Sequence, residues 1–232
     1  MPEKLKYLHF ESVDSTNDIC MHECKKNRCP TVVTADSQKK GRGRNQKKWS
    51  SPDGNLSYSF GFISKNIDPS ISVKTGLIVA RAIKKVLDIE ILLKWPNDLI
   101  FNNKKIGGVL VESENIHSSF CTVIGVGINF NVVPEESHWG NINIGVNQQQ
   151  KRKNLVQEMS NNLNELCEIR NIGWQKDWLA RCVHLNKEVT LLDEEKSFIF
   201  LGIDDEGKML LKDRSNSTKH YSDSSISVKG LY

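Results

Sequence analysis

Residues 72 to 87 repeat apolar side chains at intervals of three and four. This spacing predicts an amphipathic helix with one apolar stripe, at Val73, Leu77, Ala80, Ile83 and Leu87. Such a stripe must be buried, and the strand-like segments on either side predict a sheet that the helix covers. With 232 residues, of which 38% are hydrophobic and 26% charged, the chain is long enough for one full core plus a small appendage.

Strand and helix signals alternate before this helix. Residues 5 to 11 predict an opening strand, followed by a helix through about residue 26 that Ser15 or Thr16 can cap, with Asp18 in its first turn. The β-branched run at 31 to 35 predicts a second strand. Residues 56 to 62 alternate large apolar residues with Ser and Gly, which predicts a half-buried strand with one face on the core.

The segments after the helix complete the predicted sheet. Residues 91 to 95 predict a strand, residues 98 to 112 a hairpin around Asn102 and Asn103, and residues 120 to 130 another strand with glycines near its end. Residues 152 to 169 and 173 to 182 predict two further helices, and the polar stretch at 141 to 154 predicts a surface loop. The predicted fold class is α+β, with a mixed or antiparallel central sheet and flanking helices.

The pattern changes after His184 to short strands at eight-to-ten-residue spacing, in KEVTLL, SFIFLGI, KMLLKD and SISVKG. Short strands without helices predict a small C-terminal β-barrel of about 45 residues. We therefore expect two domains, at residues 1–184 and 185–232.

A loop at residues 39 to 48, KKGRGRNQKK, holds six cationic side chains, and a tryptophan follows it. The formal net charge of +4 would be −2 without these six residues, so the positive excess is local. Gly41 and Gly43 permit close approach of the backbone to a ligand, and Arg42 and Arg44 offer planar donors suited to phosphate or carboxylate. The loop predicts a site for a compact anionic ligand. A solvated loop or an RG-type single-strand binding element is the alternative.

The cysteines and the apolar runs predict an ordinary reduced protein. Six cysteines occur without a CxxC pair or a histidine at metal-like spacing, which favours buried free thiols. No apolar run approaches the roughly 18 residues of a spanning helix, and the N-terminus lacks the apolar core of a signal peptide. We expect a cytoplasmic protein that does not bind membranes.

Four polar segments resemble the biotin protein ligase family in their order and residue types. They are SVDSTN at 12 to 17, ADSQKKGRGRNQKKW at 35 to 49, KWPNDLIFNNKKIGGVLVE at 94 to 112, and GVGIN at 125 to 129. The resemblance covers residues 7 to about 131 strongly and the C-terminal strands weakly. It implies a class II synthetase-like catalytic domain with a small SH3-like β-barrel. It also implies an enzyme that activates biotin with ATP and Mg²⁺, and attaches biotin to a lysine of a carboxylase.

The resemblance implies a biotin site built from neutral hydrogen-bonding groups and the basic loop. Ser15, Thr16 and Gln38 would satisfy the ureido ring, which could exclude ligands lacking it. Asn17 would support that turn. The remaining biotin-site residues that the resemblance implies are Gly41, Arg42, Gly43, Arg44, Lys105, Gly107 and Gly108.

Activation brings the biotin carboxylate against the α-phosphate of ATP, so cations must offset the repulsion between two anions. The resemblance assigns this work to Arg42, Arg44 and Lys105. Asp98, in the KWPND segment, could hold Mg²⁺, orient a catalytic water or lysine, or help the acceptor lysine lose its proton. These alternatives stay open.

ATP must be held without a Walker-type loop, because the sequence contains no GxxxxGK[ST] segment. Besides the catalytic cations, the resemblance implies Trp49 packed over the adenine or adenylate, Lys94 and Asn97 from KWPND, and Asn129 at the adenine edge. Trp95 is expected in the core. The basic loop is expected to order around the adenylate and keep it from water.

Two departures from the family pattern have consequences. Asn45 and Gln46 follow GRGR where relatives often carry a further glycine, which puts in doubt how the loop turns and how tightly it retains the adenylate. The catalytic sequence begins near Met1, so we expect the monofunctional form, which does not bind DNA. A homodimer is compatible with the resemblance, because many relatives dimerise. Lipoate protein ligase and a nonenzymatic polyanion-binding module are the alternative functions.

Overall fold

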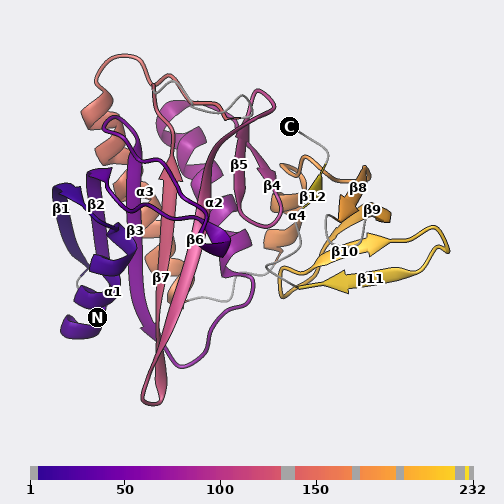
Figure 1. Ribbon diagram of the computed structural model, residues 1–232, viewed down its shortest axis with the longest axis horizontal. Coiled ribbons are helices and arrows are strands. Elements are labelled where there is room, and N and C mark those ends of the chain that lie inside the picture. The colour runs from indigo at the N-terminus through magenta and orange to yellow at the C-terminus, as the bar shows by residue number, and fades with distance from the viewer. Residues whose placement is uncertain (1–4, 132–138, 169–172, 192–195, 223–227, 230–232) are drawn as a thin grey trace.

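The computed structural model describes residues 5–131, 139–168, 173–191, 196–222 and 228–229 (Figure 1). A seven-stranded sheet forms its larger part, in the order β1-β2-β3-β7-β6-β5-β4. Only the β1–β2 pair of this sheet is parallel, so the predicted mixed sheet is confirmed. The strands are β1 Lys6–Val13, β2 Thr31–Gln38, β3 Leu56–Ser64, β4 Leu92–Lys94, β5 Asp98–Phe101, β6 Lys104–Ile116 and β7 Ser119–Ile128.

Helices cover both faces of this sheet. Helix α1 (Thr16–Asn27) packs on β2, β3 and β7, with Ser15 as its N-cap, as predicted. Helices α2 (Ile71–Leu87) and α3 (Gln148–Glu168) pack on each other and on the opposite face, where Tyr58 Oη of β3 lies 3.1 Å from Ser160 Oγ of α3.

The prediction that residues 56 to 62 form a half-buried strand was wrong about the second face. All seven residues are buried. Tyr58, Phe60 and Phe62 join the main core, while Ser59 and Gly61 lie against α1. At Gly61 an added Cβ would lie 2.9 Å from Cys20 Sγ, so the small residues let the helix approach the strand. Alternation of large and small side chains therefore marked two buried faces.

The start of α3 also differs from the prediction. The helix begins at Gln148, whereas the prediction began at residue 152. The first turns of the helix are polar and carry no apolar periodicity, so the sequence pattern did not reveal them. Leu155, Met159 and Leu163 form the predicted buried stripe. No described helix is both long and apolar enough to cross a membrane.

The C-terminal strands form a separate antiparallel sheet of order β11-β10-β9-β8-β12, which confirms the second all-β unit. Its strands are β8 Glu188–Leu191, β9 Lys196–Ile203, β10 Met209–Lys212, β11 Thr218–Tyr221 and β12 Val228–Lys229. Strand β11 was not predicted, since TKHY has little apolar character and its side chains are largely exposed. The β10–β11 hairpin projects away from the larger sheet (Figure 1).

Short contacts join this sheet to the seven-stranded sheet. Trp95 is buried, as predicted, and its Nε1 donates to Gly207 O at 2.8 Å. The segment after α4 (Trp174–Leu179) pairs with β4, where Leu93 N donates to Arg181 O at 2.8 Å and Val183 N donates to Leu93 O at 3.0 Å. The start of KWPND is thereby tied both to the C-terminal sheet and to the segment that precedes it.

Cysteine side chains are free where the structure describes them. Cys20, Cys24 and Cys121 lie together in a small buried cluster between α1 and the sheet. Cys29 and Cys182 are partly exposed and also free. Cys167 has a side chain outside the described residues. The prediction of free thiols therefore holds for these five, although two of them are not fully buried.

Candidate active site

The basic loop between β2 and β3 crosses a glycine-rich floor formed by β3, β6 and β7 (Figure 1). Gly127 of β7 pairs with Ser57 on one side and Gly108 on the other, so all three positions face the loop. A Cβ at Gly127 would lie 2.6 Å from Trp49 Nε1, and one at Gly125 would lie 2.4 Å from Asn17 Oδ1. The floor lacks side chains where these two groups touch it.

Neutral polar groups meet at one end of this floor. Gln38 Oε1 accepts from Thr16 N at 2.8 Å and from Thr16 Oγ1 at 3.0 Å, while Gln38 Nε2 donates to Ser51 Oγ at 2.9 Å. Ser59 Oγ lies 2.8 Å from Thr16 Oγ1 and 2.6 Å from Asn17 Oδ1. The structure thus brings Thr16, Asn17 and Gln38, which the family resemblance places in one site, into a single hydrogen-bonded network.

Arg42 joins the basic loop to the same end of the floor. Its guanidinium donates to Asp18 through NH1 at 3.1 Å and NH2 at 2.6 Å, and to Ser15 Oγ at 3.1 Å. Nε and NH2 also donate to the two oxygens of Glu112, at 3.0 and 2.9 Å. The hydrogen bonds with Asp18 and then Glu112 raise the pKa of Arg42 above its usual value. Two carboxylates therefore already balance this cation.

Arg44 points to the KWPND segment instead. Its NH1 donates to Asn97 Oδ1 at 3.3 Å, and Asn97 Nδ2 donates to Val109 O at 2.8 Å. The loop turns here through Asn45 and Gln46, with φ of 55° and 58°. These are the two residues that stand where relatives often have a further glycine, and both take the left-handed conformation that glycine adopts without strain.

A second charged group lies at the other end of the floor. Lys105 Nζ is 2.5 Å from Asp98 Oδ1 and 5.9 Å from the ring centroid of Trp49. Lys94 pairs with Asp98 in the β4–β5 register. Burial lowers the pKa of Lys94, and Lys105 lowers it further while Asp98 opposes the shift. The two lysines and Asp98 therefore form one coupled group beside Trp49.

Trp49 links the two ends of the floor, since its indole lies on Gly127 and stacks at 5.3 Å on Trp139. Asn129 is buried, and its amide is engaged by other loops: Nδ2 donates to Gly140 O at 3.0 Å, and Oδ1 accepts from Asn55 Nδ2 at 3.1 Å. Its contact with an adenine edge stays a prediction.

The predicted glycines differ in how much room they leave. A Cβ at Gly41 would lie 2.5 Å from Trp49 O, and one at Gly107 would lie 2.4 Å from Gly127 O. At Gly43 and Gly108 the nearest atoms would be 3.7 and 3.4 Å away. Gly41 and Gly107 are therefore required by the packing of the site itself.

Sequence reasoning missed several polar residues of the site, namely Asp18 as a partner of Arg42, Ser51, Asn55, Ser57, Ser59 and Glu112. In the sequence, Ser57 and Ser59 are the small members of a strand pattern, and Glu112 ends a motif. Within the described residues, Ser57 Oγ and His184 Nε2 are the buried side-chain atoms without a hydrogen-bond partner. Ser57 belongs to the floor, next to the Gly127 on which Trp49 lies, which makes it a candidate ligand contact.

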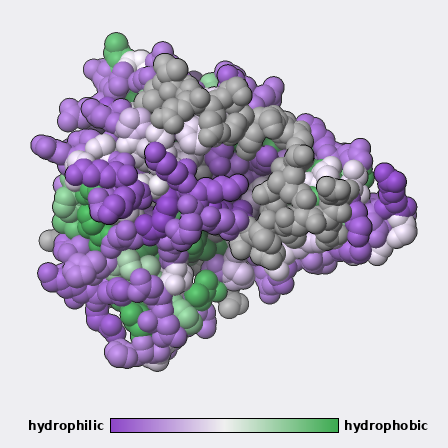
Figure 2. Space-filling view, viewed as in Figure 1, coloured by the Kyte–Doolittle hydropathy of each residue, from purple (hydrophilic) through white to green (hydrophobic). Residues whose placement is uncertain are grey.

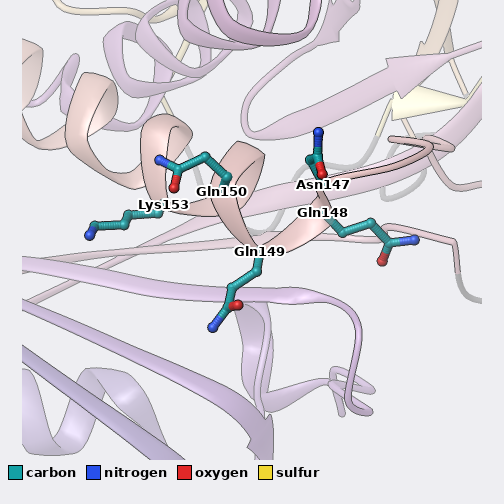
Figure 3. A pocket seen from close by; sticks show the side chains of 5 residues that line it. All are labelled: Asn147, Gln148, Gln149, Gln150 and Lys153. Atoms are coloured by element: carbon teal, nitrogen blue, oxygen red, sulfur yellow. The ribbon is translucent and has the colours of Figure 1, made fainter.

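The predicted residues do not line the hollow at the start of α3. That hollow, of about 480 Å³, is lined by Asn147, Gln148, Gln149, Gln150 and Lys153 (Figure 3). The face that carries the basic loop is mostly hydrophilic (Figure 2). The candidate site is therefore the floor and its covering loop, and not this hollow.

Comparison with known proteins assigns the chain to a family. The sequence model of the Biotin/lipoate A/B protein ligase family matches residues 9–129, more than half of the chain. The chain belongs to this family. The model of the Biotin protein ligase C terminal domain matches residues 184–229.

Individual family members agree with this assignment. Biotin--protein ligase 1, chloroplastic, of Arabidopsis thaliana is 37% identical over 125 residues, which are 50% of this chain and 34% of that protein. Bifunctional ligase/repressor BirA of Escherichia coli is 28% identical over 216 residues, or 86% of this chain and 67% of that protein. The chain therefore spans about a third of the length of the first curated relative.

A solved structure resembles the whole described fold. The biotin protein ligase of Aquifex aeolicus, in complex with biotin and ATP, superposes with a TM-score of 0.75 at 25% identity, covering 97% of this chain and 98% of that one.

Proposed function

We propose that the protein is a biotin protein ligase, which forms biotinyl-5′-AMP and pyrophosphate from biotin and ATP and then transfers biotin to a carrier lysine. The observation that supports this most is the meeting of two polar groups on one glycine floor under the basic loop: the neutral Thr16–Gln38–Ser59 network and the charged Lys94–Asp98–Lys105 group. Family membership and the biotin- and ATP-bound Aquifex relative point to the same chemistry.

The neutral network is suited to the ureido ring of biotin. Thr16, Gln38 and Ser59 present hydroxyl and amide groups that are already oriented by one another. Buried polar groups of this kind penalise ligands that cannot complete their hydrogen bonds, so the network would select biotin over an acid with a purely apolar ring. Ser15, Asn17 and the Gly41–Arg42–Gly43–Arg44 backbone complete the proposed biotin site.

The charged group is suited to the adenylation step. Biotin carboxylate oxygen attacks the α-phosphorus, and the bond from phosphorus to the bridging oxygen of pyrophosphate breaks, so negative charge grows on phosphate oxygens. Lys105 contacts Asp98 and Arg44 contacts Asn97, both in KWPND, and the two cations would stabilise that charge. Trp49 would cover the adenylate, and Lys94, Asn97 and Asn129 would hold the nucleotide. In transfer, the carrier amine attacks the acyl carbon and AMP leaves.

Mg²⁺ would enter with the triphosphate. Among the described residues there is no group of three or more His, Cys, Asp or Glu side chains that could hold a metal. Asp98 is already paired with Lys105 at 2.5 Å, a contact better suited to orienting that lysine than to a protein-held metal site. A role for Asp98 as a Mg²⁺ ligand stays a prediction, and we derive no step from it.

The proposal extends to the acceptor, the cellular location and the assembly of the protein. We propose the biotin carboxyl carrier domain of a carboxylase as the acceptor, a cytoplasmic location, and no DNA partner, with a homodimer as one possible assembly. A relative in Paracoccus denitrificans is named Biotin--[acetyl-CoA-carboxylase] ligase. We also propose residues 1–184 as the catalytic domain and 185–232 as a domain that helps position ATP or the acceptor.

Exchange of labelled pyrophosphate into ATP tests the adenylation step directly. We expect exchange with biotin, none with lipoate, and a loss of at least a hundredfold in Lys105→Ala. Lys104→Ala is the matched control, because Lys104 is the exposed neighbour on the same strand, and it should exchange within twofold of the wild type.

Other outcomes would support the alternatives. Exchange with lipoate and not with biotin would assign the protein to lipoate protein ligases. No exchange with either acid, together with steeply salt-dependent binding of a polyanion, would make the basic loop a nonenzymatic binding module.

A further inference from the structure

Glu112 lies on β6 and contacts both the N-terminal turn of α1 and the basic loop. Its Oε2 accepts from Asn17 Nδ2 at 2.7 Å and from Arg42 NH2 at 2.9 Å, and its Oε1 accepts from Arg42 Nε at 3.0 Å. One carboxylate on a strand thus receives three hydrogen bonds from two segments of the proposed biotin site.

The contact with Asn17 fixes the direction of the hydrogen bonds in the neutral network. A carboxylate only accepts, so the amide nitrogen of Asn17 must face Glu112 and its oxygen must face Ser59. Asn17 Oδ1 has no proton, and therefore the single hydroxyl proton of Ser59 goes to it across 2.6 Å. Ser59 Oγ then has no proton left to donate to Thr16 Oγ1, which lies 2.8 Å away.

Thr16 is the last member of this chain of hydrogen bonds. Its hydroxyl donates to Gln38 Oε1 at 3.0 Å. With its proton committed there, Thr16 Oγ1 keeps a lone pair for a ligand. It is therefore set as an acceptor, which is what an N–H of a ureido ring requires.

Glu112 and Asp18 both bind Arg42, but the two ion pairs differ in their exposure to solvent. Asp18 is on the exposed side of α1, with 60% of its side chain accessible against 28% for Glu112, and its described side-chain contacts are with Arg42 alone. Glu112 holds the Nε side of the guanidinium from a central strand of the sheet. Glu112 therefore anchors Arg42 to the floor, whereas Asp18 is the partner that can exchange with solvent.

We propose that Glu112 is a positioning residue for biotin. It orients the Asn17 amide and so keeps Ser59 from donating to Thr16, which leaves Thr16 as an acceptor, and it anchors Arg42 beside the same polar network. The inference rests on the proposed function, since it names the residue that organises the ureido side of that site. Glu112 acts through its neighbours and does not touch the reacting atoms.

Glu112→Gln tests this role, because glutamine keeps the size of the side chain but can donate as well as accept, so it no longer dictates the Asn17 orientation. Glu114→Gln is the matched control. Glu114 lies two residues further along the same face of β6 and binds Lys25 of α1 at 2.6 Å, so its loss also removes a strand-to-helix ion pair. Each full-length variant is measured by calorimetric titration with biotin alone and by pyrophosphate exchange.

We expect Glu112→Gln to weaken biotin binding at least tenfold and to raise the KM for biotin equally, with the KM for ATP at saturating biotin within threefold and an unchanged melting temperature. Glu114→Gln should leave biotin binding within twofold. An unchanged affinity in Glu112→Gln, an equal loss in Glu114→Gln, or equal rises in both KM values would overturn the inference.

A second variant and the wild-type control separate the role of Glu112 from the proposed function. If Glu112→Gln does not fold, Glu112→Asp takes its place, since aspartate keeps the charge but is one methylene too short to hold Asn17 and Arg42 together, and the same tenfold loss is expected. Wild-type protein that neither binds biotin nor exchanges pyrophosphate would refute the proposed function itself. Normal wild-type activity with a normal Glu112 variant would refute only the role of Glu112.

Discussion

Burial of His184 makes the stability of the protein depend on pH. The side chain lies at the start of the C-terminal unit, 1% exposed, with its ring centroid 5.6 Å from that of Phe200. Its Nε2 has no hydrogen-bond partner among the described residues. Burial lowers the pKa of His184 to about 4, and the charges of Lys94 and Lys187 lower it further, while Asp98 acts in the opposite direction.

The sign and size of the effect follow from this shift. The unfolded chain, with a pKa of 6.5 at this residue, binds more protons than the folded chain between about pH 4 and 6.5, so protonation favours unfolding. The contribution of neutral His184 is complete above about pH 6.5 and is lost as the pH falls toward 4. Between pH 7 and pH 5 the expected loss in the free energy of unfolding is about 2 kcal/mol.

Urea unfolding at pH 7 and pH 5 measures this contribution when the wild type is compared with His184→Leu. Leucine is apolar, of similar volume and cannot be protonated, so the variant should lose about 2 kcal/mol less than the wild type over the same pH step. His22→Leu is the control, because His22 is exposed on α1, and it should follow the wild type. Equal pH dependence of the wild type and His184→Leu would show that His184 is accessible to protons in the folded state and refute the reasoning.

Three further predictions concern the site and the junction. Gly127→Ala places a Cβ 2.6 Å from Trp49 Nε1 and should reduce biotin-dependent pyrophosphate exchange at least tenfold. Gly108→Ala, whose Cβ would have its nearest neighbour at 3.4 Å, should reduce the exchange less. Equal effects of the two variants would contradict the packing of Trp49 on the floor. Trp95→Phe removes the hydrogen bond to Gly207 O and should lower the free energy of unfolding by about 2 kcal/mol in urea titrations, and an unchanged midpoint would mean that the junction adds no stability. Biotin plus ATP should slow limited proteolysis within residues 39–48, and unchanged cleavage would argue against ordering of the loop around the adenylate.

Local sequence signals predicted most elements, through apolar periodicity or a capping residue. The stripe of α2 and the cap at Ser15 are examples. Strand β11 has no such pattern, since it lies at the sheet edge with exposed polar side chains and takes its conformation from pairing with β10. The second buried face of β3 was likewise set by α1, a partner that the strand sequence does not specify.

The site was predictable where one residue type suffices for the chemistry. Cations and glycines in the basic loop predict an anion site, and the family resemblance adds Thr16, Gln38 and Lys105 to the proposed site. Glu112 was not predictable, because a carboxylate next to the cations of an anion site has no evident use from sequence alone. Its proposed role depends on the contact with Asn17, which lies 95 positions away along the chain, and only the fold brings the two residues together.

The two arginines of GRGR also take different roles in the fold, although the sequence presents them as equivalent. Arg42 is balanced by Asp18 and Glu112, and Lys40 is balanced by Asp14 at 2.7 Å, while Arg44 lies against the neutral amide of Asn97. A loop that bound a polyanion through its total charge would gain little from cations already paired with carboxylates. The loop thus divides between Arg42, which two carboxylates hold beside Ser15, and Arg44, which contacts Asn97 of the KWPND segment. This division of the basic loop favours the ligase proposal over the polyanion-binding alternative.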